Sequence, residues 1–365
     1  MSDKTICFFN SNIAWGGGEK WHYGTAKYLK EKNYPVLVIA HQKSELFKNL
    51  KKIAFNVEKV SVGNLSFINP FKIFNIYRTI KKNKVEVIIM NMSTDVKTGG
   101  IAAKLAGVKK IIYRRGLAVP IKNSLLNRFL FKKVITDVIA NSLETKNTLL
   151  TNNQNLFPKE KIKVIYNGLD LHHYDQQAFE PIYQKEHDEI VLGNAGRLVE
   201  QKGQKYLIHL AQRLKEQGLK FKLLIAGVGK LEPELKQLSK EFGVEKEILF
   251  LGFIDNIKGF MESIDIFLLS SLWEGFGYVI TEAMASQKPV VAFDISSNPE
   301  VVSDGESGYL AEAKNMDDFY SKVEKLMTSE KLRDQFGKAG RKLVEERFTM
   351  EKAQKEVESF INYQS

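Results

Sequence analysis

The sequence predicts an α/β protein made of two doubly wound domains, each with a parallel β-sheet between layers of helices. Short apolar runs alternate with segments of helical period along the whole chain, which is typical of parallel sheets with crossover helices. The alternation occurs in two series, and a polar segment without clear period separates them at 169–188. Glycine-rich loops follow several of the apolar runs, as expected where a strand leads into a helix.

The first series contains the strands of the first domain. Strands are expected at 5–10, 35–40, 85–90, 110–113, 137–140 and 162–166. Between the first two, Trp21, Thr25, Tyr28 and Leu29 occur at helical spacing, and the segment 33–35 ends that helix. This order predicts a βαβ unit at the start of the chain.

The second series begins at Glu189. Its strands are expected at 190–193, 221–226, 248–251, 264–269 and 289–293, and amphipathic helices are expected from Met316 onward, the last at 350–363. We therefore predict a first domain at 1–170, a linker at 171–188 and a second domain at 189–348. Open α/β sheets bind ligands at the carboxyl ends of their strands, so a ligand crevice is expected at that edge of both sheets.

Composition limits the class of protein. The chain has 365 residues, of which 44% are hydrophobic and 27% charged, which excludes disorder and fibres and fits two domains of ordinary size. The single cysteine, Cys7, lies in an apolar run, so intrachain disulfides and multi-thiolate metal sites are excluded. No apolar run reaches the length of a membrane span, and no signal-peptide core follows the first four residues. We expect a cytoplasmic protein.

The net charge of +11 predicts an acidic partner. The first half carries basic clusters at Lys72, Arg78, Lys81, Lys82, Lys84, Lys109, Lys110, Arg114, Arg115, Lys122, Arg128, Lys132 and Lys133. Residues 124–135 mix basic with large apolar side chains, as an interfacial helix on an anionic membrane does, although a half-buried helix with solvated lysines has the same pattern. No nucleic-acid-binding module is present, so we expect no nucleic-acid partner.

The most informative segment is 271–282, where two carboxylates flank a Gly-x-Gly turn. Gly275 and Gly277 follow the expected strand at 264–269, and a helix is expected to start near Tyr278. Glu274 and Glu282 would then face one crevice, where carboxylates accept hydrogen bonds from sugar hydroxyls and helix-start amides hold an anion. This pattern predicts a nucleotide-sugar site, and two solvated glutamates are the alternative.

Other loops after strands suit the anionic part of such a ligand. Gly16, Gly17 and Gly18 open a helix, so their amides can approach a phosphate, or they form a plain strand-to-helix turn. Arg197 and Lys202 lie in another loop and can stabilise a diphosphate leaving group, or they are solvated charges.

Two further glycine loops follow later strands. Gly227 and Gly229 form one, and Gly252 with Phe253 forms the other. Both suit backbone contact with a flat nucleotide base.

Several chemistries have no support in the sequence. The six histidines lack metal-ligand spacing and no Asp-x-Asp occurs, so we expect no metal. A P-loop and a Gly-x-Ser-x-Gly elbow are both missing, which disfavours P-loop phosphoryl transfer and serine hydrolysis. No cofactor is expected beyond the substrate.

Seven motifs taken together resemble glycosyltransferase family 4, whose members are retaining enzymes with the GT-B fold. They are Gly16-Gly17-Gly18, Ala140-Asn-Ser142, Val164-Ile-Tyr-Asn-Gly168, Gly196-Arg-x4-Lys-Gly203, Gly227-x-Gly229, Leu251-Gly-Phe253 and Glu274-Gly-Phe-Gly-x4-Glu282. The resemblance spans nearly the whole chain. It implies two domains that face each other across a cleft, with the final helix, at 349–365, crossing back to the first domain.

The resemblance also implies roles for the site residues. Glu282 would bind the ribose, Glu274 the donor sugar, and Arg197 with Lys202 the departing diphosphate. Backbone around Phe276 and Gly277 would contact sugar or phosphate. The remaining donor-binding positions are Gly16, Gly17, Gly18, Gly196, Gly227, Phe253 and Gly275.

One position departs from the family pattern. Many members carry a histidine near the end of the strand that here continues into Arg114 and Arg115. These arginines are candidates for acceptor or phosphate contact, or Arg115 is a surface or interdomain charge. Asp95 is the nearest acidic group expected in the crevice, where it would orient a hydroxyl or begin a helix.

The sequence thus predicts a hexosyltransferase-type enzyme of the EC 2.4 class. We expect it to move a sugar with retention from a UDP-, GDP- or ADP-sugar to a glycan or lipid-linked acceptor in cell-surface polysaccharide or lipopolysaccharide synthesis, at the inner face of the cytoplasmic membrane. A GT-B nucleotide-sugar epimerase and a basic binding protein without catalysis are the alternatives.

Overall fold

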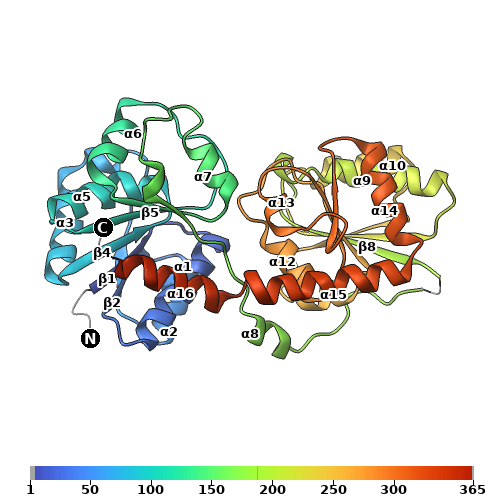
Figure 1. Ribbon diagram of the computed structural model, residues 1–365, viewed down its shortest axis with the longest axis horizontal. Helices are drawn as coiled ribbons and strands as arrows, with labels where there is room; N and C mark the ends of the chain where they lie inside the picture. Colours follow the sequence, from blue (N-terminus) through green and yellow to red (C-terminus); the bar gives the residue numbers. More distant parts are fainter. Residues whose placement is uncertain (1–4, 187, 364–365) are drawn as a thin grey trace. The chain divides into compact units, whose positions relative to one another are not determined.

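The computed structural model describes residues 5–186 and 188–363, which form two compact units (Figure 1). The first unit takes the chain up to Asn167 together with the residues from Glu351 onward, and the second takes Gly168–Met350. The predicted fold class is confirmed, since each unit is a parallel sheet with helices on both faces.

The first unit has a seven-stranded parallel sheet in the order β3-β2-β1-β4-β5-β6-β7. Its strands are β1 Thr5–Asn10, β2 Val36–His41, β3 Val57–Val60, β4 Val85–Met90, β5 Lys110–Arg115, β6 Asp137–Ala140 and β7 Ile162–Val164. Strand β3 was not expected, because the charged Glu58 and Lys59 interrupt its short apolar pattern at the sheet edge.

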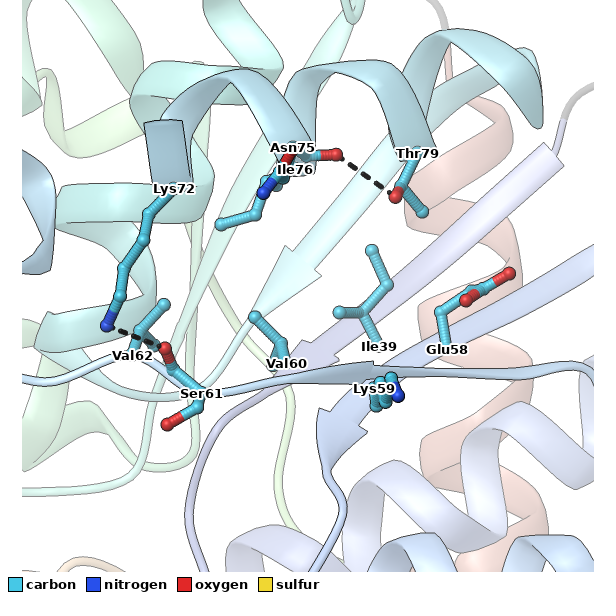
Figure 2. Close-up of a pocket in the computed structure, with 10 residues that line it drawn as sticks. All are labelled: Ile39, Glu58, Lys59, Val60, Ser61, Val62, Lys72, Asn75, Ile76 and Thr79. Carbon is cyan, nitrogen blue, oxygen red and sulfur yellow. Dashed lines mark hydrogen bonds between the residues drawn. The ribbon is translucent and has the colours of Figure 1, made fainter. Parts of the chain in front are cut away.

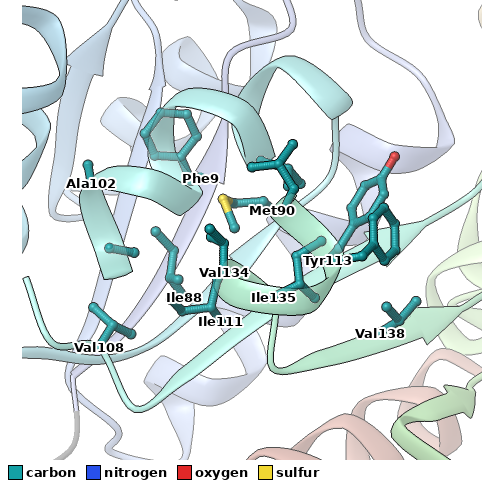
Figure 3. Close-up of a cluster of buried hydrophobic side chains, with 14 of the residues drawn as sticks. Phe9, Ile88, Met90, Ala102, Val108, Ile111, Tyr113, Val134, Ile135 and Val138 are labelled. Atoms are coloured by element: carbon teal, nitrogen blue, oxygen red, sulfur yellow. The ribbon is translucent and has the colours of Figure 1, made fainter. Parts of the chain in front are cut away.

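Two apolar cores lie on the two faces of this sheet. Along β1, Cys7 and Phe9 belong to one core and Ile6 and Phe8 to the other, because successive strand side chains point to opposite faces. Figure 3 shows the first of these cores, in which Ile88 and Met90 of β4 pack against the helical layer that contains Val134. Burial on both faces explains why these strands are continuous apolar runs.

Each core is closed by its own helices. One face is covered by α1 Gly17–Glu31, α2 Glu45–Lys52 and α16 Met350–Asn362. The other is covered by η1 Ser66–Ile68, α3 Pro70–Lys82, α4 Ser93–Asp95, η2 Val96–Gly100, α5 Ile101–Leu105, α6 Leu125–Phe129, η3 Leu130–Val134 and α7 Leu143–Leu149. The short helix η4 Lys159–Lys161 precedes β7.

The final helix, α16, packs on the first unit, as the sequence predicts. Val357 is fully buried in the core that α1 and α2 also close. Glu358 accepts hydrogen bonds from the hydroxyls of Tyr28 (2.6 Å) and Tyr34 (3.0 Å). Burial and the bond to Glu358 raise the pKa of Tyr28 to about 12. Helix α16 is therefore part of the first unit although it is last in the chain.

The second unit has a six-stranded parallel sheet in the order β10-β9-β8-β11-β12-β13. Its strands are β8 Ile190–Ala195, β9 Phe221–Ala226, β10 Ile248–Gly252, β11 Ile266–Leu269, β12 Val290–Phe293 and β13 Gly308–Ala311. Its helices are α8 Leu171–Gln176, η5 Glu200–Lys202, α9 Gln204–Glu216, α10 Glu232–Glu241, α11 Ile257–Glu262, α12 Tyr278–Ala285, α13 Asn298–Val301, α14 Met316–Met327 and α15 Glu330–Arg347. Strand β13 was not expected, because four residues that begin with glycine carry little strand signal.

The segment expected to be a linker, 171–188, lies within the second unit. The hydroxyl of Tyr174 donates to the carbonyl of Glu282 (3.1 Å), and Arg341 makes two bonds of 2.7 Å to Asp175. The chain changes unit at 167–168 and again at 350–351, next to the paired backbones of Leu169 and Thr349. Local sequence could not show this, because the partners are more than a hundred residues away.

Candidate active site

The loops at the carboxyl edge of the second sheet are hydrogen-bonded to one another. The amide of Gly196, after β8, donates to Ala226 at the end of β9 (2.9 Å). The amide of Gly227 donates to Gly252 at the end of β10 (2.7 Å). Gly227 has a φ of +133°, and a Cβ there would overlap the carbonyl of Gly196, so this contact requires glycine. The three loops thus form a continuous backbone surface at the predicted nucleotide position.

Phe253 follows this surface and is 72% exposed. An exposed aromatic ring next to free backbone edges suits contact with a flat base.

A nearly buried ion pair lies at the same edge. The ammonium of Lys202 is 2.5 Å from a carboxylate oxygen of Glu274, and the two side chains are only 15% and 8% exposed. The hydroxyl of Ser297 donates to the backbone carbonyl of Glu274 (3.4 Å), so the β12–α13 loop holds this segment. The structure therefore brings together two residues that the sequence had assigned to one donor.

Arg197 belongs to the loop that leads to Lys202. Its side chain is exposed, and its Nη2 lies 3.5 Å from the side-chain oxygen of Gln201. Gln201 also accepts from the amide of Leu272 (2.7 Å) and donates to the carbonyl of Trp273 (2.9 Å). These bonds fix the loop that carries the two cations against the loop that carries Glu274.

Helix α12 begins where the Gly-x-Gly turn predicts. Gly277 precedes its first residue with a φ of +79°, and Glu282 lies about one turn into the helix, where it is half-buried. Phe276 is buried against Tyr278 and Phe348, each at a ring distance of 5.6 Å. The side chain of Phe276 is thus buried within the second unit.

In the first unit, the glycine loop is closed by a residue that the sequence had not singled out. Helix α1 begins after Gly16, and the carboxylate of Glu19 accepts from the amide of Gly16 (3.1 Å) in a capping box. The same carboxylate accepts from the side-chain amides of Asn10 (3.1 Å) and Asn12 (3.0 Å), and Glu19 is only 4% exposed.

These contacts describe the strand-to-helix turn that was the alternative for Gly16, Gly17 and Gly18. The amide of Gly16 is already bonded, and a buried carboxylate disfavours a phosphate beside it. We therefore do not assign a phosphate of the ligand to this loop.

Arg114 and Arg115 are both buried, which differs from the surface position considered for Arg115. Arg114 donates to the side-chain oxygens of Asn91 (2.9 Å) and Asn167 (2.6 Å), and its guanidinium lies 4.7 Å from the ring centre of Trp21. Arg115 donates to the hydroxyl of Tyr113 (3.0 Å) and to a backbone carbonyl. Arg114 joins three elements at the carboxyl edge of the first sheet, whereas Arg115 stabilises the loop that follows β5.

Asp95 has no exposed surface. Its carboxylate accepts from the hydroxyl (2.5 Å) and amide (3.3 Å) of Ser11 and from the amide of Met92 (3.3 Å). Burial raises its pKa to about 7 although these bonds act in the opposite direction. The geometry supports the structural alternative for Asp95, a helix start that joins β1 to β4, and we do not retain it as a catalytic residue.

His22 is a buried polar residue that sequence reasoning had considered only as a metal ligand. Its ring lies between Phe8 and Trp21, at centroid distances of 5.4 and 5.5 Å. Neither ring nitrogen has a hydrogen-bond partner within the described residues. Burial, and to a lesser degree the charge of Arg114, lower its pKa to about 3, so the imidazole is neutral.

Residues 5–186 and 188–363, which the structure describes, contain no helix that is long and apolar enough to cross a membrane. None of the His, Cys, Asp and Glu side chains of these residues form a group of three that could hold a metal ion.

Comparisons with known families agree with this architecture. Residues 15–173 match the model of Glycosyltransferase Family 4, and residues 175–343 match that of Glycosyl transferases group 1. With two parallel-sheet units and both matches in order, the protein is a glycosyltransferase with the GT-B fold, in the EC 2.4 class. The chain belongs to glycosyltransferase family 4.

Named relatives lie at moderate identity. An enzyme of Campylobacter jejuni, N-acetylgalactosamine-N,N'-diacetylbacillosaminyl-diphospho-undecaprenol 4-alpha-N-acetylgalactosaminyltransferase, is 34% identical over 214 residues, which are 58% of this chain and 57% of that enzyme. The UDP-Gal:alpha-D-GlcNAc-diphosphoundecaprenol alpha-1,3-galactosyltransferase of Escherichia coli is 28% identical over 273 residues, 70% of each chain. Anabaena HepE, solved with UDP and glucose, has a TM-score of 0.81 at 22% identity over 98% of this chain and 99% of its own.

Proposed function

We propose that the protein moves a sugar, with retention of configuration, from a nucleoside-diphosphate donor to a polyprenyl-diphosphate-linked glycan in cell-surface glycan synthesis. The observation that carries this proposal is the ion pair of Lys202 and Glu274 beside the joined glycine loops of the second unit. It puts a cation for a diphosphate and an acceptor for sugar hydroxyls at one point of the sheet edge.

The donor would lie along that edge. The base contacts the backbone around Gly227 and the ring of Phe253, and Glu282 on α12 accepts from the ribose hydroxyls. Arg197 and Lys202 bind the diphosphate, and Glu274 binds the sugar. UDP is the first nucleotide to test, because one relative is named for UDP-Gal and HepE was solved with UDP.

The transfer follows from these positions. The bond between the anomeric carbon and the diphosphate oxygen breaks, and the acceptor oxygen bonds to the same face of that carbon. The acceptor's proton passes to the departing phosphate oxygen, so no protein base is required. Arg197 and Lys202 stabilise the charge that grows on the diphosphate, which is the largest contribution that a protein makes to such a step.

The acceptor would be held by the first unit and reached at an anionic membrane surface. Both named relatives act on diphospho-undecaprenol carriers according to their names, and the basic clusters of this chain lie in its first half. Arg114, at the carboxyl edge of the first sheet, is the candidate for contact with the acceptor's diphosphate.

A transfer assay tests the proposal. UDP-, GDP- and ADP-sugars are incubated with polyprenyl-diphosphate glycans, and NMR of the product reports the anomer formed. We expect an α-linked product from an α-linked donor, with turnover reduced about a hundredfold in Lys202→Met. Lys236→Met, in the exposed pair of Lys236 and Glu232, is the matched control.

Other outcomes would replace the proposal. Donor turnover without an acceptor would indicate an epimerase. Binding of polyanions without preference for nucleotide sugars would indicate a binding protein.

A further inference from the structure

Four large apolar side chains project from one short stretch of the first unit. Leu65, Ile68, Phe71 and Phe74 lie in and beside η1 and α3, and they are 69%, 66%, 79% and 55% exposed. We name them, with the exposed basic Arg78, Lys81 and Lys82 of the same helix, the α3 surface. A cluster of this kind on a single chain marks an interaction site.

Core packing does not explain these residues. Ile76 and Ile80 on the inner side of α3 are buried, and Ile73 and Tyr77 pack beside them. Helix α3 therefore has its full apolar face against the sheet and a second set of apolar side chains outside it. Phe74 stacks on Tyr77 at a centroid distance of 6.1 Å, which holds its ring on the outer side.

The charges within the segment that carries these side chains have one sign, and the carboxylate of Glu58, which precedes the segment, lines the hollow beside α3. Residues 59–85 contain no aspartate or glutamate, and their basic residues are Lys59, Lys72, Arg78, Lys81, Lys82 and Lys84. Lys72 is used internally, because its ammonium donates to the carbonyl of Ser61 (3.1 Å) and the hydroxyl of Ser66 (3.2 Å). Arg78, Lys81 and Lys82 form no ion pair with any described residue, so their charge is available to an anionic partner.

A hollow beside α3 shows that this side of the helix is not covered. Figure 2 shows the hollow, of about 230 Å³, between α3 and the edge strand β3, with Ile39, Val60 and Ile76 in it and the Lys72 bond to Ser61 drawn at one end. It is lined only by β2, β3, the segment that follows β3, and α3. None of the α3-surface residues lines this hollow, but the hollow and the edge strand β3 place α3 at the edge of the first unit.

The part of the α3 surface that contains Leu65, Ile68 and Phe71 lies at the carboxyl edge of the sheet, whereas Lys81 and Lys82 end the helix near the start of β4. Helix η1 and the first turn of α3 follow the carboxyl end of β3, and every strand pair of this sheet is parallel. They therefore lie at the same edge as Asn91 and Arg114, which follow or end neighbouring strands.

We propose that the α3 surface docks on an anionic lipid bilayer. The headgroup region receives the four apolar side chains, Leu65, Ile68, Phe71 and Phe74. Lipid phosphates pair with the basic side chains of Arg78, Lys81 and Lys82. Helices that lie at a membrane interface typically carry exposed apolar side chains beside basic side chains that form no ion pair within the protein. A protein partner would instead need a surface that is both acidic and apolar. This inference rests on the proposed function for its purpose, which is to bring the enzyme to a lipid-linked acceptor.

The segment 124–135, which the sequence favoured for this role, fits it less well. Leu130, Phe131 and Val134 are 2–4% exposed and belong to the core, so only Leu125 and Phe129 project from that segment. The pattern there is mainly that of a half-buried helix with solvated lysines, which was the alternative.

Co-sedimentation of the full chain with vesicles tests the proposal. Phosphatidylcholine vesicles with phosphatidylglycerol are compared with phosphatidylcholine alone, for the wild type, Phe71→Ser/Phe74→Ser and Arg78→Gln/Lys81→Gln/Lys82→Gln. We expect binding to anionic vesicles only, with the partition coefficient reduced about tenfold or more in each variant, because each removes inserted apolar area or paired charge. Leu125→Ser/Phe129→Ser and Lys240→Gln/Lys246→Gln/Lys331→Gln are matched controls that should bind as the wild type does.

Three results would overturn the proposal. These are no sedimentation of the wild type, unchanged sedimentation of both α3-surface variants, or loss of binding in Leu125→Ser/Phe129→Ser alone. A concentration-dependent dimer that Phe71→Ser/Phe74→Ser dissolves, without vesicle binding, would assign the surface to self-association. Sugar transfer to a water-soluble acceptor is measured in parallel, so that intact transfer by a wild type that does not sediment with anionic vesicles contradicts this inference and leaves the proposed function standing.

Discussion

At the scale of single residues, the Lys202–Glu274 pair defines how a donor would be held. Both groups are nearly buried, so each is costly to leave without a partner, and a diphosphate that approaches Lys202 competes with Glu274 for it. Binding of the diphosphate would then release Glu274 toward the sugar. In the proposed function, the pair would thus couple recognition of the two halves of the donor.

The variant Glu274→Gln tests this coupling. The amide oxygen can still accept a hydrogen bond from Lys202. We therefore expect the free energy of unfolding, measured by urea denaturation, to fall by less than about 1 kcal/mol. Turnover should fall about a hundredfold, because the charged acceptor for the sugar is lost. Wild-type turnover in this variant, measured beside the surface control Glu232→Gln, would refute the assignment of Glu274.

His22 gives the clearest pH dependence. Its pKa is lowered to about 3 in the folded protein, whereas the unfolded chain has the ordinary value of 6.5. Between these values the unfolded state binds a proton that the folded state excludes, so stability falls as the pH drops from 6.5 toward 3.

We expect His22→Leu to abolish this fall in stability at low pH, because leucine does not bind a proton. The substitution also removes two buried ring nitrogens that have no hydrogen-bond partner within the described residues. Its melting temperature should exceed that of the wild type by more at pH 5 than at pH 8. The exposed His173→Leu serves as control, and an unchanged pH dependence of melting in His22→Leu would contradict the account of His22.

Sequence reasoning missed two kinds of residue, those with local partners that it did not check and those whose partners are distant in the chain. Glu274, Lys202 and the glycine loops of the second unit stay predictions, which rest on local spacing and on the order of the motifs in a family. The capping role of Glu19 could have been found from the three-residue spacing to Gly16. The burial of Arg114 depends on Trp21, Asn91 and Asn167, which no local pattern connects.

At the scale of elements, α16 completes the first unit. Its fully buried Val357 lies in a core shared with α1, α2 and the sheet. We expect Val357→Ala to reduce the free energy of unfolding by about 2 kcal/mol, as other large-to-small core substitutions do. The exposed Ser359→Ala on the same helix should change it by less than about 0.5 kcal/mol. Equal effects in urea unfolding would mean that α16 does not close this core.

Four strands have the bounds that the sequence predicts, and all four are paired on both sides. They are β1, β4, β6 and β9, whose side chains are mostly buried. β3 and β13 are edge strands, so each pairs with only one neighbouring strand. A short sequence of mixed polarity is enough to form such a strand. Their pairing depends on the neighbouring strand rather than on their own pattern.

At the scale of the whole molecule, the chain leaves the first unit at Asn167 and returns to it at Glu351. The fold class could be predicted because the alternation of strands and helices is repeated in both series. The expected domain ends, 170 and 348, lie close to the changes of unit at 167–168 and 350–351. The place of residues 171–188 in the second unit could not be predicted, because contacts to α12 and α15 hold this segment only after folding.

This organisation predicts how fragments behave. Residues 168–350 should fold cooperatively as a separate chain, because their core is complete. Residues 1–167 should aggregate or melt early, because the face that α16 covers is then exposed, and addition of a 350–365 peptide should restore order. Circular dichroism melting of each fragment checks this, and a stable 1–167 fragment would contradict the role given to α16.

We propose that the carboxyl edge of the second sheet binds a nucleoside diphosphate through Lys202. The most direct measurement is the melting temperature of the wild type and of Lys202→Met with UDP, GDP, ADP and their sugars. A ligand at one hundred times its Kd stabilises the folded state by about 2.7 kcal/mol. We predict that one nucleotide series raises the wild-type melting temperature and that Lys202→Met loses most of the rise. No rise with any nucleotide, or an equal rise in Lys202→Met, would contradict the claim.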